Sequence, residues 1–446
     1  MKTGLFRLTS KSALAAALVA MLFSAAACDN DHNHLNFLII PTRTPKPTTA
    51  PTTKPTAPPT AKPTPTPTAV PATPTPSPTP PFVNFGVSVV GDDGNGFTNG
   101  LQIMTVEDAS GKPLPTPLST FAPLSAGDID GLSITADGTH GAVIDGGNTV
   151  FFFTSDLKTG KVTLLPATVD VSSFGGDGDS IASLPGGDEV VVSGGGSTQL
   201  ALVSGVLSGT PTIVGGIDTS KMGVEYDALV ISDDGKVMLS RSGTGDVLDV
   251  YSIAATTPRS PASFTITKTF KAPDIHTLCC DGRGGLASSP PDSSRAVLVS
   301  NDGTVQLFTG LPAAPVIANS ITLTGGAKAV TISRDGKFAI VALGTGGLAV
   351  VGGVDTGTLA QVGSAFSPTV TVPGGSCKLD DPSTLGVMAD NKFVVAIQDC
   401  GLPRSATDVG SGVLLTIPLS PTGALSTPVG QLNFVVTPDN DQLLVH

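Results

Sequence analysis

The sequence predicts an all-β protein: a seven-bladed β-propeller of four-stranded antiparallel blades that follows a disordered Pro/Thr-rich stalk. Three observations predict this fold. The 446 residues include 53 glycines, and 40% of the chain is hydrophobic, which is typical of short apolar strands separated by tight turns. A turn motif recurs about every 50 residues along the chain. No segment carries a helical apolar stripe with caps.

Four regions follow from the changes in composition along the chain. We expect a signal peptide over residues 1–27, a spacer over 28–40, a Pro/Thr-rich linker over 41–81 and the propeller over 82–446. The signal peptide has three basic residues within its first eleven, followed by an apolar run over 13–23 that is too short to span a bilayer.

Cys28 follows three alanines at the end of this apolar run, in a pattern that resembles the lipobox of bacterial lipoproteins. The family prefers leucine at the position of Ala25. The resemblance implies that the Cys28 thiol is acylated and anchors the mature chain to a membrane, on the extracytoplasmic side of a bacterial cell envelope. The alternative is ordinary signal cleavage beside an incidental cysteine.

The linker over 41–81 contains 16 prolines, which fix the backbone angle φ and remove hydrogen-bond donors. We expect an extended, semi-rigid spacer that reaches on the order of 100 Å. Its threonines either carry O-glycans, as in other Pro/Thr-rich stalks, or stay bare.

The repeated unit of the last region is a short apolar strand, a tight turn rich in Asp, Gly, Asn and Pro, and a second apolar strand. Such turn residues suit hairpins because several of them tolerate positive φ. Seven units of about 50 residues indicate a propeller in which each unit is one blade. The middle residues of the seven turns are Asp137, Gly186, Asp234, Asp292, Asp335, Asp390 and Asp439.

Both ends of this region are expected to build one blade together. The C-terminus supplies the first two strands of that blade, because only 442–446 follow the last turn. Strand-like runs at Phe85–Val90, Leu101–Val106 and Leu118–Phe121 complete it. Closing the ring in this way removes free sheet edges.

The strand–turn units at Val330–Phe338 (Val-Thr-Ile-Ser-Arg-Asp-Gly-Lys-Phe) and Leu229–Val237 resemble those of the YVTN/lactonase-like seven-bladed β-propellers. The resemblance covers nearly all of 82–446. It implies a fold that hosts many functions, so it assigns no activity.

Acidic residues recur nine and seven residues before the middle of the unit turns, where the chain enters the innermost strand. Because innermost strands line the channel of a propeller, we expect these acids to form an arc at one mouth of it. Carboxylates crowded in this way favour a hard cation such as Ca²⁺, and the alternative is a solvated acidic rim. The candidate ligands are Asp128, Asp130, Asp177, Asp179, Glu225, Asp227 and Asp381.

Four cysteines besides Cys28 suit an oxidising compartment. Cys377 and Cys400 flank the turn at Asp390, and antiparallel pairing about this turn predicts a disulfide between them. Cys279 and Cys280 are adjacent and either form a vicinal disulfide or remain thiols.

Charge and composition limit the function. The propeller region has 17 cations and 34 acids, a balance that argues against nucleic-acid binding. Two functions remain open: a lipid-anchored propeller that binds an unknown protein or small molecule, and a lactonase-like hydrolase that uses a metal in the acidic mouth. The chain has only five histidines and no recognisable nucleophile motif, which favours the non-catalytic function.

Overall fold

The computed structural model divides the chain into two units, Met1–Thr79 and Pro80–His446, and every residue described below belongs to the second. The described residues are 85–90, 100–108, 112–123, 129–135, 137–145, 147–156, 161–195, 199–242, 247–271, 285–290, 293–372, 375–380, 382–400, 412–433 and 443–445. The expected signal peptide, spacer and linker lie outside these ranges, as do Cys28, Cys279 and Cys280.

Six four-stranded antiparallel sheets, blades 1 to 6, each consist of four consecutive strands. Blade 1 contains β4 (Ile129–Ile134), β5 (His140–Asp145), β6 (Thr149–Asp156) and β7 (Lys161–Asp170). Blade 2 contains β8 (Gly176–Ser183), β9 (Glu189–Gly195), β10 (Gln199–Ser204) and β11 (Thr212–Asp218). Blade 3 contains β12 (Ala228–Ile231), β13 (Val237–Ser242), β14 (Val247–Ile253) and β15 (Phe264–Lys271).

The other three consecutive blades follow the same order. Blade 4 contains β16 (Leu286–Ser288), β17 (Arg295–Val299), β18 (Thr304–Thr309) and β19 (Val316–Thr322). Blade 5 contains β20 (Ala329–Ile332), β21 (Phe338–Ala342), β22 (Leu348–Gly352) and β23 (Ala360–Phe366). Blade 6 contains β26 (Pro382–Val387), β27 (Phe393–Asp399), β28 (Gly412–Pro418) and β29 (Gly430–Asn433).

A further four-stranded sheet, the closing sheet, joins the two ends of the propeller region. Its order is β3 (Pro113–Pro123), β2 (Gly100–Glu107), β1 (Phe85–Val90) and β30 (Leu443–Val445). The three apolar runs before the first unit turn therefore form strands, as predicted.

The blades of consecutive strands number six, whereas the sequence predicted seven blades. The expected division of the closing sheet was also wrong. Among the described residues the C-terminal segment supplies β30 alone, because β1, β2 and β3 already fill three positions. The preceding strand, β29, pairs with β28 as the outer strand of blade 6, with Leu432 opposite Leu414.

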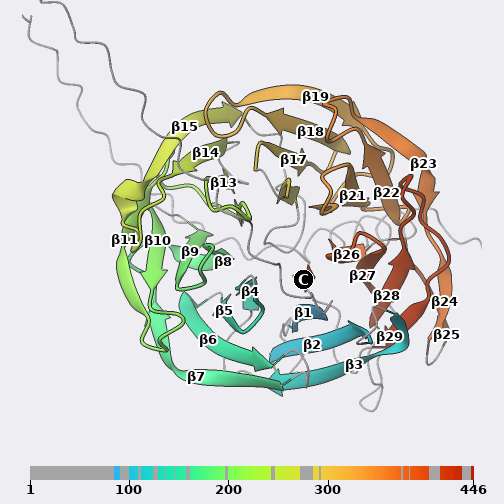
Figure 1. Ribbon diagram of the computed structural model, residues 1–446, viewed down its shortest axis with the longest axis horizontal. Coiled ribbons are helices and arrows are strands. Elements are labelled where there is room, and N and C mark those ends of the chain that lie inside the picture. The colour runs from blue at the N-terminus through green and yellow to red at the C-terminus, as the bar shows by residue number, and fades with distance from the viewer. Residues whose placement is uncertain are drawn as a thin grey trace, which may run out of the picture. The chain divides into compact units, whose positions relative to one another are not determined.

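The first strand of each consecutive blade lies nearest the axis, and the fourth lies at the rim (Figure 1). The inner strands β4, β8, β12, β16, β20, β26 and β30 each contact the next, and β30 contacts β4, so they form a closed ring. Clusters of buried apolar side chains join adjacent blades; one contains Ile144 of blade 1 and Val192 of blade 2. The described residues include no α-helix, and a 3₁₀ turn spans Pro261–Ser263.

The predicted unit turns connect the first and second strands of their blades. Asp137, Gly186, Asp234, Asp335 and Asp390 all lie in such connections, whereas Asp292 and Asp439 lie outside the described residues. Three of these turns share one geometry, in which a Ser or Thr hydroxyl donates to the aspartate two residues later, and that aspartate accepts a backbone N–H two residues further on. The motif is therefore explained by local hydrogen bonding.

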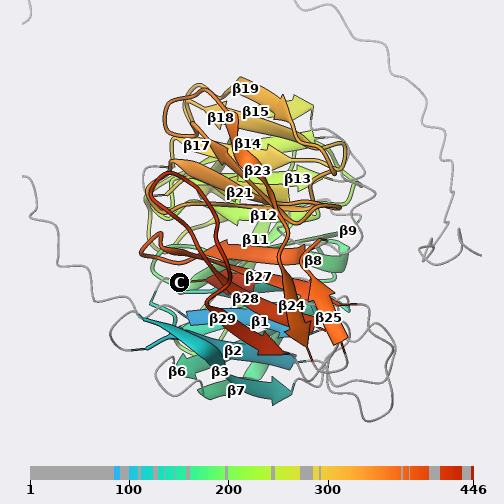
Figure 2. The same ribbon diagram turned by 90° about the vertical axis from the view of Figure 1, so that its right-hand side faces the viewer.

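The predicted disulfide between Cys377 and Cys400 is confirmed, with a Cα–Cα distance of 5.1 Å. It links blade 6 to a two-stranded hairpin, β24 (Thr369–Val372) and β25 (Gly375–Lys378). The hairpin lies beside β28 and β29 in both views (Figures 1 and 2), and the Gln431 side chain donates to the Thr371 carbonyl at 2.7 Å. The disulfide thus holds an extra hairpin on the outer side of a blade.

A membrane-spanning helix is not found in the described part of the chain.

Candidate ligand-binding mouth

The predicted acidic residues lie where the inner strands of blades 1, 2 and 3 begin; this end of the ring is called the acidic mouth. Asp130 is the second residue of β4, and Asp177 and Asp179 lie within β8. Glu225 and Asp227 come just before β12. These strands are neighbours in the inner ring, so the same end of three consecutive blades carries the acids. Asp128 and Asp381 lie outside the described residues.

Three of these acids lie at shifts in the backbone register. Ile129 pairs with Asp145 and Gly131 with Ile144, which leaves Asp130 as the extra residue of a bulge. Gly176, Gly178 and Ser180 pair with Gly195, Gly194 and Ser193, so Asp177 and Asp179 are extra residues as well. A bulge bends its strand locally, and bulges are enriched next to functional sites. The spacing of the acids did not predict the bulges.

A preformed metal site is not present among the side chains that the structure describes. No group of three or more His, Cys, Asp or Glu residues in that part of the chain is close enough to hold a metal ion. Carboxylate oxygens are nevertheless the donors that calcium takes in proteins. The predicted Ca²⁺ site therefore stays a prediction.

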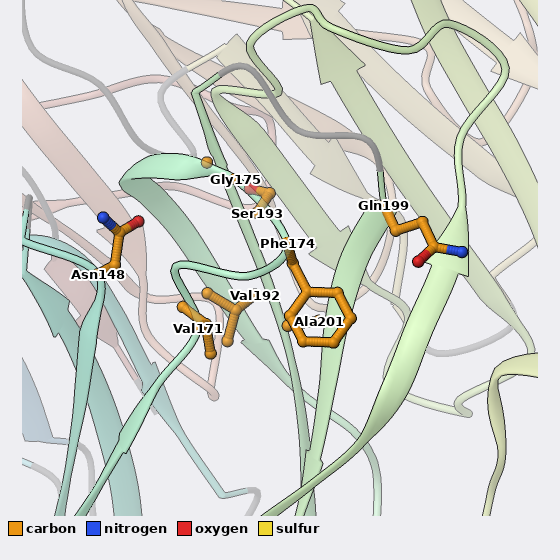
Figure 3. A pocket seen from close by; sticks show the side chains of 9 residues that line it. Asn148, Val171, Phe174, Gly175, Val192, Ser193, Gln199 and Ala201 are labelled. Carbon is orange, nitrogen blue, oxygen red and sulfur yellow. The ribbon is translucent and has the colours of Figure 1, made fainter.

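A small pocket opens between blades 1 and 2, at the same end of the ring as the acidic mouth. Figure 3 shows the Asn148 amide on one side, the Gln199 amide on the other, and Val171, Val192 and Phe174 between them. The rest of its lining is Gly175, Ser193, Gly194 and Ala201.

This pocket adjoins the bulged part of β8, because its lining residue Gly194 pairs with Gly178, which separates Asp177 from Asp179. Gln199 is held in place by a 2.7 Å hydrogen bond from its Nε2 to Asp218 Oδ1. Asn148 has a φ of 71° in the turn between β5 and β6, a conformation that asparagine tolerates better than most residues. No sequence motif marks the pocket, because its residues come from four separate segments.

The opposite end of the ring carries the unit turns, where aspartate and lysine side chains form ion pairs. Lys236, Lys337 and Lys392 each contact the aspartate of their own turn at 2.7–2.8 Å. At Asp335, burial alone would raise the carboxyl pKa, but hydrogen bonds from Lys337 and Ser333 lower the pKa overall. His140 is also at this end, beside Thr139. It is the one histidine in the described ranges, and the length of the β4–β5 hairpin separates it from Asp130.

Comparison with known proteins identifies structures that share the fold of this chain. No protein-family model matches the chain, and no curated protein matches it. Solved structures do match. A putative 6-phosphogluconolactonase from Bacteroides uniformis is 17% identical, with a TM-score of 0.58, and the match covers 82% of this chain and 100% of that one.

Two further matches agree with this comparison. A putative 6-phosphogluconolactonase from Bacteroides fragilis is 17% identical, with a TM-score of 0.59 and coverage of 83% of this chain and 100% of that one. The periplasmic gluconolactonase of Pseudomonas aeruginosa is 16% identical, with a TM-score of 0.56 and coverage of 81% and 99%. The chain therefore has the β-propeller fold found in these lactonase-like proteins.

Proposed function

We propose that this protein is a lipid-anchored propeller of the bacterial cell envelope that binds a ligand at its acidic mouth. The observation that carries the proposal is the position of Asp130, Asp177 and Asp179 on bulges of two adjacent inner strands. The inner strands that surround this mouth are β4, β8, β12, β16, β20 and β26 of the six blades, together with β30 of the closing sheet. The ligand is a protein or small molecule that carries positive charge, or one that binds through Ca²⁺.

Calcium binding is tested by thermal unfolding of residues 82–446 with and without added Ca²⁺. A ligand that binds only the folded state stabilises it by about 2.7 kcal/mol at a concentration of 100 times its Kd. Asp130→Asn and Asp179→Asn should reduce the shift. Asp355→Asn is the matched control, since Asp355 lies between β22 and β23 at the other end of the ring. An equal shift in all three variants would place the cation elsewhere, and no shift in the unsubstituted protein would leave the acids as a solvated rim.

A lactonase-like hydrolase is the second candidate function, and the three lactonase-like structures that share the fold favour it. In such a reaction a divalent cation at the acidic mouth would polarise the lactone carbonyl. Lactone hydrolysis releases a proton, so a pH-stat measures it directly against the spontaneous rate. A rate above background that EDTA abolishes and that Asp130→Asn lowers would support the hydrolase. A rate equal to background over a panel of sugar lactones would leave the binding function.

The anchor is tested separately from the ligand. Cys28→Ser removes the one thiol at the expected cleavage site, so the variant should move from the detergent phase to the aqueous phase on partitioning. Cys279→Ser, which changes a thiol far from the signal, is the control and should stay in the detergent phase. If the unsubstituted protein itself partitions into water, the chain carries no lipid.

A further inference from the structure

The segment that carries Glu225 and Asp227 is tied to a buried carboxylate in blade 3. Asp249 lies on β14 and is fully buried. Its Oδ2 accepts the backbone N–H of Ser220 at 2.9 Å and the hydroxyl of Tyr226 at 3.0 Å. Its Oδ1 accepts the hydroxyl of Thr269 at 2.7 Å. Three donors therefore compensate for the desolvation of the charge.

The segment 218–227 connects β11 to β12, and further hydrogen bonds fold it against the same place. The Tyr226 hydroxyl lies 3.3 Å from the Lys221 carbonyl, and the Thr219 hydroxyl donates to that carbonyl at 3.1 Å. The Tyr251 hydroxyl donates to the Asp218 carbonyl at 3.1 Å. Asp249 and the two tyrosines thus hold both ends of the segment.

The packing around the Tyr226 hydroxyl suits this role. The packing is dry, because Tyr226 and Tyr251 are both fully buried and belong to the apolar cluster between blades 2 and 3. A buried charge that loses a donor here has no water to replace it.

We infer that Asp249 is a positioning residue, whose buried carboxylate sets the location of Glu225 and Asp227 at the acidic mouth. The positioning itself does not depend on the proposed function. Its expected effect on cation affinity rests on that function. Partners that orient metal-binding groups typically contribute 10–100-fold to metal affinity. The chain also contains its own reporter: Tyr226 and Tyr251 are its only tyrosines, and it has no tryptophan. Intrinsic tyrosine emission therefore comes from this network alone.

Hydrogen–deuterium exchange tests the positioning directly. In Asp249→Asn and Tyr226→Phe, the amides of 219–227, Ser220 above all, should exchange at least about tenfold faster than in the unsubstituted protein. Glu189→Gln is the matched control, since it alters a buried carboxylate at the other end of the ring and should leave this segment unchanged. Tyr226→Phe keeps the aromatic ring and so covers the case in which Asp249→Asn does not fold. Unchanged exchange of the segment in a folded variant would overturn the inference.

Calcium titration, followed by calorimetry and tyrosine emission, tests the consequence. The affinity should fall by about tenfold in Asp249→Asn and stay unchanged in Glu189→Gln. If the unsubstituted protein binds no calcium, the proposed cation site fails, while the exchange experiment still decides whether Asp249 holds the segment. Faster exchange with unchanged affinity would show that Asp249 holds the segment without tuning the site, and this would overturn the link to the acidic mouth.

Discussion

Arg334 in blade 5 reaches past blade 4 to Asp233 in blade 3: its Nη1 lies 2.8 Å from Asp233 Oδ2, across 101 residues of sequence. Both residues belong to unit turns. The backbone N–H of Arg334 also donates to Asn391 Oδ1 in the unit turn of blade 6. One turn therefore connects three blades at the end of the ring opposite the acidic mouth.

The contact between Arg334 and Asp233 should nevertheless add little stability. Its side chains are 31% and 50% exposed, and exposed ion pairs contribute about 0–1 kcal/mol. Glu189 and Arg259 form the contrasting pair, with side chains 11% exposed or less and two contacts at 2.6 and 2.7 Å. We expect Asp233→Ala to lower the free energy of unfolding by less than about 1 kcal/mol and Glu189→Ala by about 3 kcal/mol.

Urea denaturation at neutral pH measures both values. Glu189→Ala leaves the Arg259 guanidinium buried without its partner, which is the source of the larger cost. A smaller cost for Glu189→Ala than for Asp233→Ala would show that burial does not decide the strength of these pairs.

Two glycines with nearly the same backbone angle should respond differently to substitution. Gly303 (φ 84°) would place a Cβ 2.1 Å from the Leu323 carbonyl oxygen, whereas Gly357 (φ 86°) has nothing within 4 Å of that position. Left-handed backbone costs a residue with a Cβ about 1–2 kcal/mol at either site. Gly357→Ala should show this cost alone. Gly303→Ala must also displace backbone, so its loss should exceed about 3 kcal/mol.

Thermal unfolding of the two alanine variants gives the comparison. Equal losses would mean that the turn after β17 relaxes freely and that the close approach of Leu323 does not constrain it.

The fold was predictable from the sequence because its determinants are local. Asp234 and Asp335 form turns through hydrogen bonds to residues within two positions, so the repeat of these turns is visible in the chain itself. The disulfide was predictable for a related reason, since the hairpin about Asp390 pairs Pro382 with Gln398 and so brings together the segments before and after it. The order of the closing sheet was not predictable, because β30 meets β1 across nearly the whole propeller region and no local motif specifies that pairing.

The same reasoning explains what was missed at the candidate site. The spacing of the acids could not predict the bulge at Asp130, because a bulge depends on the partner strand. Here Asp145 and Ile144 pair with Ile129 and Gly131. Asp249 was also missed. It is 29 residues from its partner Ser220, and nothing in a single strand sequence marks a carboxylate as buried.

Low pH should lower the stability of the folded protein by protonating the aspartates of its turns. Asp302 accepts hydrogen bonds from the Ser300 hydroxyl and from the backbone N–H of Thr304. These bonds, the first of them most, stabilise the charged carboxylate and lower the Asp302 pKa below the ordinary value of 3.8. A group whose pKa is lower in the folded state stabilises the fold above its unfolded pKa, and this contribution is lost as the pH falls through the folded pKa. Stability should therefore fall below about pH 4.

Melting temperatures measured at about pH 5 and about pH 2.5 test whether stability falls with pH as predicted. Asp302→Asn removes one titrating group, so its melting temperature should fall less over this interval than that of the unsubstituted protein. An identical fall in both proteins would show that Asp302 has the same pKa folded and unfolded.

Removal of the disulfide should destabilise the protein without changing the ring. Cys377 and Cys400 are 23 positions apart, and a cross-link that closes a loop of this length contributes about 3 kcal/mol, mainly by restricting the unfolded chain. The double variant Cys377→Ser, Cys400→Ser should lose about this much free energy of unfolding. It should keep the far-ultraviolet spectrum of a β-protein, because β26 to β29 pair independently of the bond. Dithiothreitol should lower the unsubstituted protein to the stability of the variant and leave the variant unchanged. Alkylation of Cys377 before reduction, detected by mass spectrometry, would show that the bond is not formed.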